Sequence, residues 1–175
     1  KGELFLWGRN NYGQIGSPSI IDHRTPQKLE GHKDFVAIEG GYWHTLGLKK
    51  DGTVWSWGHN FYGELGNGTR EHSSWPTEVV QMEGNQVSVL KNVIQIASVG
   101  YHTLALKKDG SVWGWGTNNF NELGQKGDEV QKYAIKIESI PPMKEVAVGW
   151  HHSVALDING NIWVWGSDPA FQFQE

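Results

Sequence analysis

Three histidines, His44, His102 and His152, occupy equivalent positions in three similar segments of the chain. Imidazole nitrogens are common zinc ligands, and zinc needs each nitrogen about 2.0–2.1 Å away. In an array of repeats, equivalent positions are rotated away from one another, so these rings could converge only near the axis of the array. We therefore predict no metal site and no cofactor. Each ring is expected to hydrogen-bond backbone near the glycine-containing turn that precedes it.

The adjacent pair His151-His152 is no better as a chelate, because neighbouring strand residues point to opposite faces. Catalytic motifs are also missing from the sequence, which has no cysteine, no Gly-x-Ser-x-Gly elbow and no Gly-x-x-x-x-Gly-Lys phosphate loop. Asp51, Asp109 and Asp157 lie in or beside predicted hairpin turns, where turn chemistry explains them. We predict no catalytic residues and no enzyme, with nucleotide exchange on a GTPase as the activity left open.

Composition limits the partners. The 175 residues carry a net charge of −4, whereas nucleic-acid affinity depends largely on clustered Lys and Arg. No stretch approaches the roughly 18 apolar residues of a membrane helix. We expect a protein partner, with neither nucleic acid nor membrane bound. The lack of cysteine does not decide the compartment, so localisation stays open.

One eight-residue segment occurs four times, and this repetition constrains the architecture. Its closing glycines, Gly8, Gly58, Gly116 and Gly166, lie 50, 58 and 50 residues apart. A period of about fifty residues fits the blade of a propeller. The four copies are Lys1–Gly8, Asp51–Gly58, Asp109–Gly116 and Asn159–Gly166.

The pattern of apolar and turn residues predicts about four strands in each repeat. Asp51-Gly52 predicts a two-residue hairpin with positive φ at both residues. Trp55 and Trp57 should share one face of their strand, so that large rings and smaller residues of neighbouring sheets interlock. Small residues at Gly47, Ala105 and Ala155 predict close approach of neighbouring backbones. The strands of the first repeat are expected at Thr25–Leu29, Phe35–Ile38, His44–Leu48 and Val54–Trp57.

The linked motifs Gly-x-x-His-[Thr/Ser]-x-[Gly/Ala]-Leu, [Asp/Asn]-Gly-x-[Val/Ile]-Trp-x-Trp-Gly and Asn-x-x-Gly-x-[Leu/Ile]-Gly resemble the regulator of chromosome condensation repeat family. The resemblance covers almost the whole chain and departs from the pattern at Val99, Asn121 and Ser167–Phe171. It implies an all-β fold, a β-propeller of four-stranded blades whose ring has seven blades. We expect about three full blades plus a partial one here.

Residues 1–175 should therefore form a single propeller-repeat array that is an incomplete ring. Such an array is part of a longer polypeptide, a half-ring completed by another chain such as a second copy, or an open array with its own caps. The family's founding activity is nucleotide exchange on a small GTPase, performed from one face of the ring. Other proteins with similar repeats resemble scaffolds or protein inhibitors. The family's functional residues cannot be matched to positions in this sequence.

Aromatic residues outside the repeated motifs are the first binding candidates. Tyr42, Trp43, Tyr101 and Trp150, with His151, lie in the turns before the repeated histidines. If these rings line one rim of the propeller, they make a surface typical of protein interfaces. The alternative is that the rings fold over the blade ends and have only a structural role.

The second candidate is the connection from Gln81 to Asn92, which accounts for the eight extra residues of one repeat. Insertions in repeat arrays often form loops on a functional face, so Gln81, Glu83 and Asn85 are binding candidates. A tolerated surface insertion is the alternative. The main prediction is a protein–protein interaction module. The alternatives are a guanine nucleotide exchange factor and a carbohydrate-binding lectin that uses the same aromatic rings.

Overall fold

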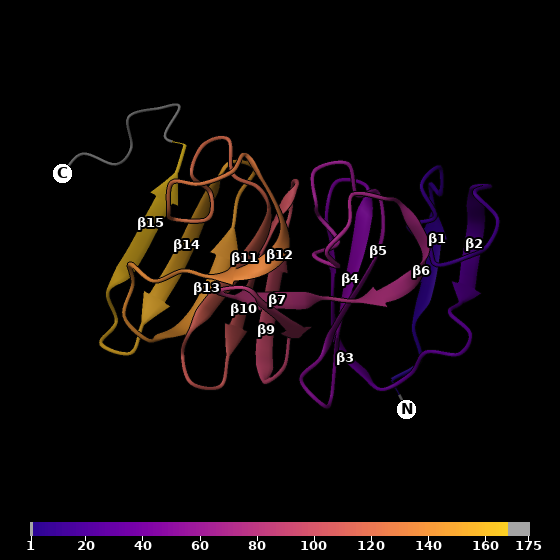
Figure 1. Ribbon diagram of the computed structural model, residues 1–175. Coiled ribbons are helices and arrows are strands. Elements are labelled where there is room, and N and C mark those ends of the chain that lie inside the picture. The colour runs from indigo at the N-terminus through magenta and orange to yellow at the C-terminus, as the bar shows by residue number, and fades with distance from the viewer. Residues whose placement is uncertain (1, 168–175) are drawn as a thin grey trace.

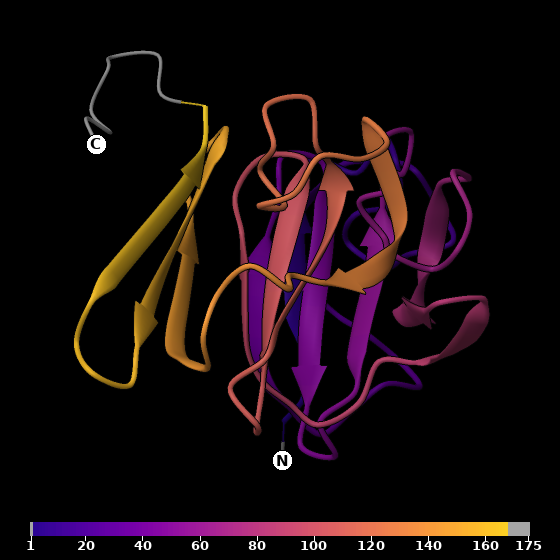
Figure 2. The same cartoon turned by 60° about the vertical axis from the view of Figure 1, so that its left-hand side comes forward.

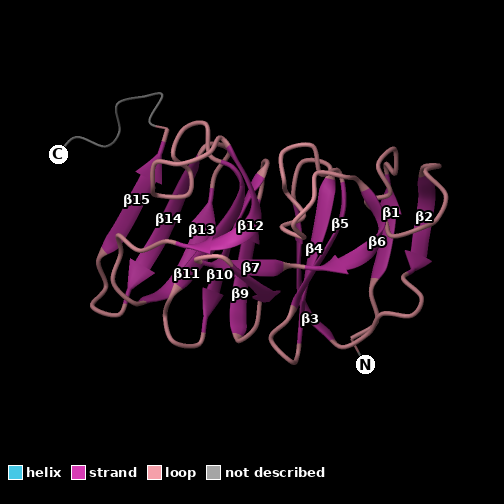
Figure 3. Ribbon diagram, viewed as in Figure 1, coloured by secondary structure: helices cyan, strands magenta, loops and turns pink. Residues whose placement is uncertain are grey.

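The computed structural model describes residues 2–167, which form strands joined by turns and loops (Figure 3). No helix that could cross a membrane occurs among these residues. The strands are β1 (Phe5–Gly8), β2 (His23–Lys28), β3 (Phe35–Gly40), β4 (His44–Lys49), β5 (Val54–Gly58), β6 (Ser73–Glu78), β7 (Val80–Glu83), β8 (Gln86–Val89), β9 (Val93–Ser98), β10 (His102–Lys107), β11 (Val112–Thr117), β12 (Val130–Lys136), β13 (Met143–Val148), β14 (His152–Asp157) and β15 (Ile162–Gly166).

The strands form four sheets that follow one another along the chain (Figure 1). We call them blade A (β1–β2), blade B (β3–β6), blade C (β9–β12) and blade D (β13–β15). Neighbouring strands within each blade are antiparallel. The first strands of blades B, C and D contact one another in sequence, β3 with β9 and β9 with β13. This stacking of similar sheets is the architecture of a propeller.

The blades are offset by one strand from the repeats expected from the sequence. The segment Thr25–Leu29, expected to open a repeat with Phe35–Ile38, lies mostly in β2 and pairs with β1 instead. The described residues therefore hold two four-stranded blades, one blade of three strands and one of two, rather than three full blades and a part. Of the departure at Ser167–Phe171, residues 168–171 lie outside the described residues.

The hairpin turns differ from the predicted two-residue type. Gly52 has φ +83°, but Asp51 is not among the residues with positive φ. The Gly52 N–H donates to the carbonyl of Lys49, so the turn is longer and only glycine adopts the left-handed conformation. The Asp51 carboxylate instead accepts the N–H and hydroxyl of Thr53, at 3.0 and 2.7 Å. Asn121, where another repeat has glycine, has φ +59°, as a left-handed asparagine can.

The glycine that closes each Trp-x-Trp-Gly strand is required by the backbone. Gly116 has φ +98°, and a Cβ there would lie 2.0 Å from the carbonyl oxygen of Tyr101. Gly47 has a different reason from the one predicted, because a Cβ there would meet the ring of Phe35 rather than a neighbouring backbone. The small residue makes room for a side chain of its own blade.

Neighbouring blades pack with a tryptophan-bearing face against an aliphatic face, as the alternation of side chains predicts. Trp113 and Trp115 of blade C lie in one apolar cluster with Leu46, Leu48 and Val54 of blade B. Trp115 is fully buried, and its indole N–H donates to the carbonyl of Glu64 at 2.8 Å. The same hydrogen bond joins Trp165 of blade D to Glu122 at 2.8 Å. Burial of these rings and the bonds at their edges hold the array together.

The repeated histidines link neighbouring blades. The Nε2 of His44 lies 3.3 Å from the Ser98 hydroxyl, and that of His102 lies 3.1 Å from the Ser153 hydroxyl. The prediction that each ring binds backbone of its own turn is wrong for these two, because the hydrogen-bond partner of Nε2 is a hydroxyl of the next blade. Burial lowers the pKa of His44 to about 3 and that of His102 to about 4, and neighbouring histidines add to both shifts. Within residues 2–167, no three His, Asp or Glu side chains form a group that could hold a metal ion.

Candidate functional site

Four of the predicted aromatic residues lie together on one rim of the array. The Tyr42 ring centroid is 4.6 Å from that of Trp43, 5.4 Å from Tyr101 and 5.4 Å from Trp150. Tyr42 and Trp150 are 45% and 51% exposed. Rings from blades B, C and D thus form a continuous surface.

Each junction between blades carries an equivalent aromatic pair on this rim. Tyr12 packs on Trp43, Tyr62 on Tyr101 and Phe120 on His151, with centroids 5.2, 4.8 and 4.9 Å apart. In every pair, the first ring belongs to the loop after a Trp-Gly strand and the second to the turn before the repeated histidine of the next blade. We call the whole set the aromatic rim: Tyr12, Tyr42, Trp43, His59, Tyr62, His72, Tyr101, Phe120, Trp150 and His151.

Backbone hydrogen bonds hold these loops and turns in register. The N–H groups of His59, Thr117 and Ser167 donate to the carbonyls of Trp43, Tyr101 and His151, at 2.9, 2.9 and 2.7 Å. The rim is therefore a product of the repeated backbone.

The loop members of these pairs were not among the residues predicted from the sequence. Tyr12, Tyr62 and Phe120 share the third position of the motif that begins with Asn10, Asn60 or Asn118. An aromatic residue at that position in all three copies was the available signal. The asparagine and glycines of the motif carry the family resemblance, and they do not by themselves point to this aromatic position.

A buried histidine–carboxylate pair lies beneath the rim. The Nδ1 of His59 lies 2.6 Å from the Glu64 carboxylate, and both side chains are buried. His72 stacks on His59 at 4.6 Å, and Tyr12, Trp43, Tyr62 and Tyr101 complete the surroundings of His59.

Burial lowers the pKa of His72 and raises that of Tyr101. Neither His59 nor His72 could be found from periodicity, because each occurs in a single repeat. Tertiary packing alone assigns them to the rim.

The inserted segment lies elsewhere. Val80–Glu83 and Gln86–Val89 pair as a hairpin, and β7 joins the outer edge of blade C through β12. Gln81 accepts a hydrogen bond from the ammonium of Lys107 at 2.6 Å, while Glu83 and Asn85 are exposed. Lys107 is five residues along β10 from His102, or about 16 Å from the rim end of that strand. The structure thus separates Gln81, Glu83 and Asn85 from the aromatic candidates.

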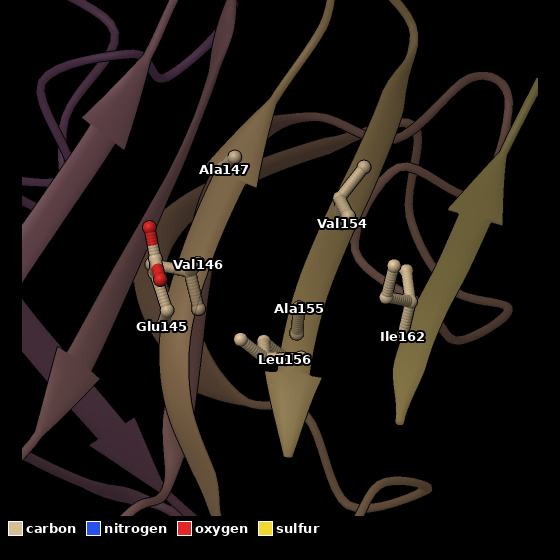
Figure 4. A pocket seen from close by; sticks show the side chains of 7 residues that line it. All are labelled: Glu145, Val146, Ala147, Val154, Ala155, Leu156 and Ile162. Atoms are coloured by element: carbon tan, nitrogen blue, oxygen red, sulfur yellow. The ribbon is translucent and has the colours of Figure 1, made fainter. Parts of the chain in front are cut away.

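A shallow apolar pocket of about 220 Å³ occurs on blade D (Figure 4). Its lining residues are Glu145, Val146, Ala147, Val154, Ala155, Leu156 and Ile162. Figure 2 shows blade D at one end of the array, with one face turned away from blade C. This pocket is a mid-sheet feature of an uncovered blade face and not part of the aromatic rim.

Comparison with known proteins identifies the repeat. The pattern described as "Regulator of chromosome condensation (RCC1) repeat" matches residues 1–48, 51–106 and 109–156. A second pattern of the same description matches residues 35–64, 93–122 and 143–172. The chain belongs to the RCC1 repeat family. Its β-propeller fold follows from this membership and from the sheets described above.

Relatives in the RCC1 repeat family are much longer than this chain. The E3 ubiquitin-protein ligase HERC2 of Mus musculus is 33% identical over 152 residues, which cover 85% of this chain and 3% of that protein. The ultraviolet-B receptor UVR8 of Arabidopsis thaliana is 33% identical over 138 residues, covering 78% of this chain and 30% of the receptor. The similarity concerns the repeats and a small share of each relative.

Solved propellers superpose on most of the chain. Human WBSCR16 superposes with a TM-score of 0.82 at 24% identity. The match covers 98% of this chain and 45% of WBSCR16, and it shows the shared fold. Yeast RCC1 (Prp20), solved with Kap60, gives 26% identity, a TM-score of 0.77 and coverage of 94% and 40%. A structure of Prp20p from Saccharomyces cerevisiae, described with its binding properties to Gsp1p and histones, gives 27% identity and a TM-score of 0.70, with coverage of 94% and 41%.

Proposed function

We propose that this chain is a protein-interaction module that presents the aromatic rim to a protein partner. The observation that carries the proposal is the contact of the Tyr42 ring with those of Trp43, Tyr101 and Trp150, which come from three blades, and the exposure of about half of Tyr42 and Trp150. Aromatic anchors surrounded by other packed residues are typical of the centres of protein interfaces. Yeast Prp20 is solved in complex with Kap60 and is described as binding Gsp1p and histones, which supports a protein as the partner.

Binding of purified histones and of Gsp1p to the 175-residue chain tests this proposal. We expect Tyr42→Ala and Trp150→Ala to weaken binding of the true partner at least tenfold, since truncated anchor residues cost about 2 kcal/mol or more. Trp75→Ala is the matched control, because Trp75 is 48% exposed on β6 and lies outside the rim. Equal losses from all three substitutions would contradict the proposal.

Exchange activity on a small GTPase is the second candidate, supported by similarity to Prp20p and its described binding to Gsp1p. Accelerated release of a fluorescent nucleotide from Gsp1p would select it. Nucleotide release at the intrinsic rate, with histone binding retained, would exclude exchange activity and leave the protein-interaction module as the remaining proposal. The lectin alternative stays a hypothesis, for which sugar-dependent quenching of tryptophan fluorescence is the test.

A second copy of the chain is a further proposed partner, because the two ends of the array expose complementary faces. Phe5 and Trp7 of blade A are 48% and 60% exposed, whereas Ile162 and Val164 of blade D are 71% and 38% exposed. At the internal junctions a tryptophan-bearing face covers an aliphatic face of this kind. We expect a head-to-tail dimer in light scattering and its dissociation by Trp7→Asp. A monomer at high concentration would exclude it.

A further inference from the structure

Three equivalent loops each hold an acidic or amide side chain beneath the rim. Gln14, Glu64 and Glu122 each use one side-chain oxygen to accept the backbone N–H two residues earlier, at 2.9, 2.8 and 2.8 Å. This shared bond fixes the orientation of the three side chains. Their second polar atoms are free to have different partners.

The second carboxylate oxygens of Glu64 and Glu122 differ in their partners. Glu64 Oε1 is paired with His59 at 2.6 Å. The residue equivalent to His59 in the next repeat is Thr117, and Glu122 Oε1 is a buried oxygen with no hydrogen-bond partner within residues 2–167. Leaving a buried carboxylate oxygen unpaired is unfavourable, so a donor that reaches it gains free energy.

Glu122 is fixed at this place. The residue is 1% exposed, and its carbonyl accepts hydrogen bonds from the Ser153 hydroxyl at 2.7 Å and from the Trp165 indole at 2.8 Å. These bonds tie its backbone to blade D. The half-exposed His151 ring lies beside the carboxylate, so a ligand from solvent would reach Glu122 on the rim side.

The side chain above Glu122 is a half-exposed histidine. The Nδ1 of His151 lies 3.6 Å from Glu122 Oε1, beyond good hydrogen-bond distance. His151 packs edge-on against Phe120, which is 47% exposed, and its chain neighbour Trp150 is 51% exposed. A rotation of the His151 side chain would expose the Glu122 carboxylate to a ligand beside the Phe120 ring.

We propose that Glu122, Phe120 and His151 form a subsite for an arginine side chain of the protein partner. A guanidinium supplies directional donors for the carboxylate and a flat face that stacks on aromatic rings, which an ammonium lacks. This inference rests on the proposed function of the aromatic rim and names the chemistry that one part of the rim recognises. Glu64 is the equivalent residue of the preceding repeat. Its carboxylate is already paired with His59, so it offers no such subsite and serves as the matched control.

N-acetyl-arginine amide is the probe, and N-acetyl-citrulline amide is its neutral counterpart. Binding is followed by NMR through the Trp150 indole and His151 ring signals of the 175-residue chain. We expect saturable shifts with the arginine probe and at least tenfold weaker binding of the citrulline probe. Glu122→Gln should abolish the arginine response, whereas Glu64→Gln should retain it, with the amide spectrum showing that both variants are folded.

Three results would overturn the subsite. The first is equal binding of both probes, and the second is an arginine response that survives Glu122→Gln. The third is a His151 ring that stays beside Glu122 and is not displaced by arginine. A protein partner that needs Tyr42 and Trp150 but is indifferent to Glu122→Gln would overturn the subsite and leave the proposed function of the rim standing.

Discussion

The junction between blades B and C and the junction between blades C and D are built alike but closed to different degrees. At the first, Trp115 is fully buried and the Glu64 carboxylate is paired with His59. At the second, Trp165 makes the same indole bond but is only partly buried, and Oε1 of Glu122 has no hydrogen-bond partner among residues 2–167. The repeated backbone places Glu64 and Glu122 at equivalent positions. A single residue, His59 in one repeat and Thr117 in the next, then decides whether the buried carboxylate oxygen has a partner.

The largest difference is expected from the two indoles. Trp115→Ala should cost about 3–5 kcal/mol of unfolding free energy, because it removes a buried ring and a hydrogen bond to Glu64. Trp165→Ala removes the equivalent bond from a partly exposed ring and should cost roughly half as much. Denaturant unfolding followed by circular dichroism measures both. Equal losses would show that the two junctions are equally closed.

The buried pair is the next distinction. His59→Thr installs the residue found in the following repeat and leaves the Glu64 carboxylate without its partner, at a cost of about 3 kcal/mol. His151→Ala removes the half-exposed ring above Glu122 and should cost less than about 1 kcal/mol. The same unfolding assay compares them. If the two variants lose the same free energy, His59 does not close its junction as proposed.

Acid should weaken the junctions through His44 and His102. Their pKa values in the folded chain, about 3 and about 4, lie below the ordinary value of 6.5, mainly because burial disfavours the charged ring. The unfolded chain therefore binds protons first, so the contribution of each histidine is complete above pH 6.5. It is lost as the pH falls toward the folded pKa, by up to about 1.4 kcal/mol per pH unit. Unfolding titrations between pH 7 and 4 should show this slope, and His44→Gln should reduce it; an unchanged slope would exclude His44 as a source.

The smallest effect concerns the inserted hairpin. Gln81→Ala removes the acceptor of the Lys107 ammonium, with an expected cost of about 1 kcal/mol because the site is part-buried. Partner binding at the rim should be unchanged, since the hairpin lies at the other end of β10. Thermal unfolding and the binding assay separate the two effects. Weaker binding by this variant would place the hairpin in the interface.

Much of the candidate site could be predicted from residues that repeat. Tyr42, Trp43, Tyr101 and Trp150 precede equivalent histidines, so the expectation that they share a rim followed from the period alone, and their centroid distances agree with it. Gln81, Glu83 and Asn85 were predicted from an insertion, which says that a repeat is longer but not where the extra residues pack. Pairing of β7 with β12 decided that.

By itself, the sequence determined the propeller fold, the family and the alternation of tryptophan-bearing and aliphatic faces. These follow from local periodicity and from glycines such as Gly116, whose conformation no other residue adopts easily. The tertiary structure alone decided which histidine bonds which hydroxyl and where the blades divide. It also decided that Oε1 of Glu64 pairs with His59, while the buried Oε1 of Glu122 has no hydrogen-bond partner among residues 2–167. Such contacts join residues of different repeats, and a periodic pattern specifies equivalent positions without specifying which single side chains meet across a junction.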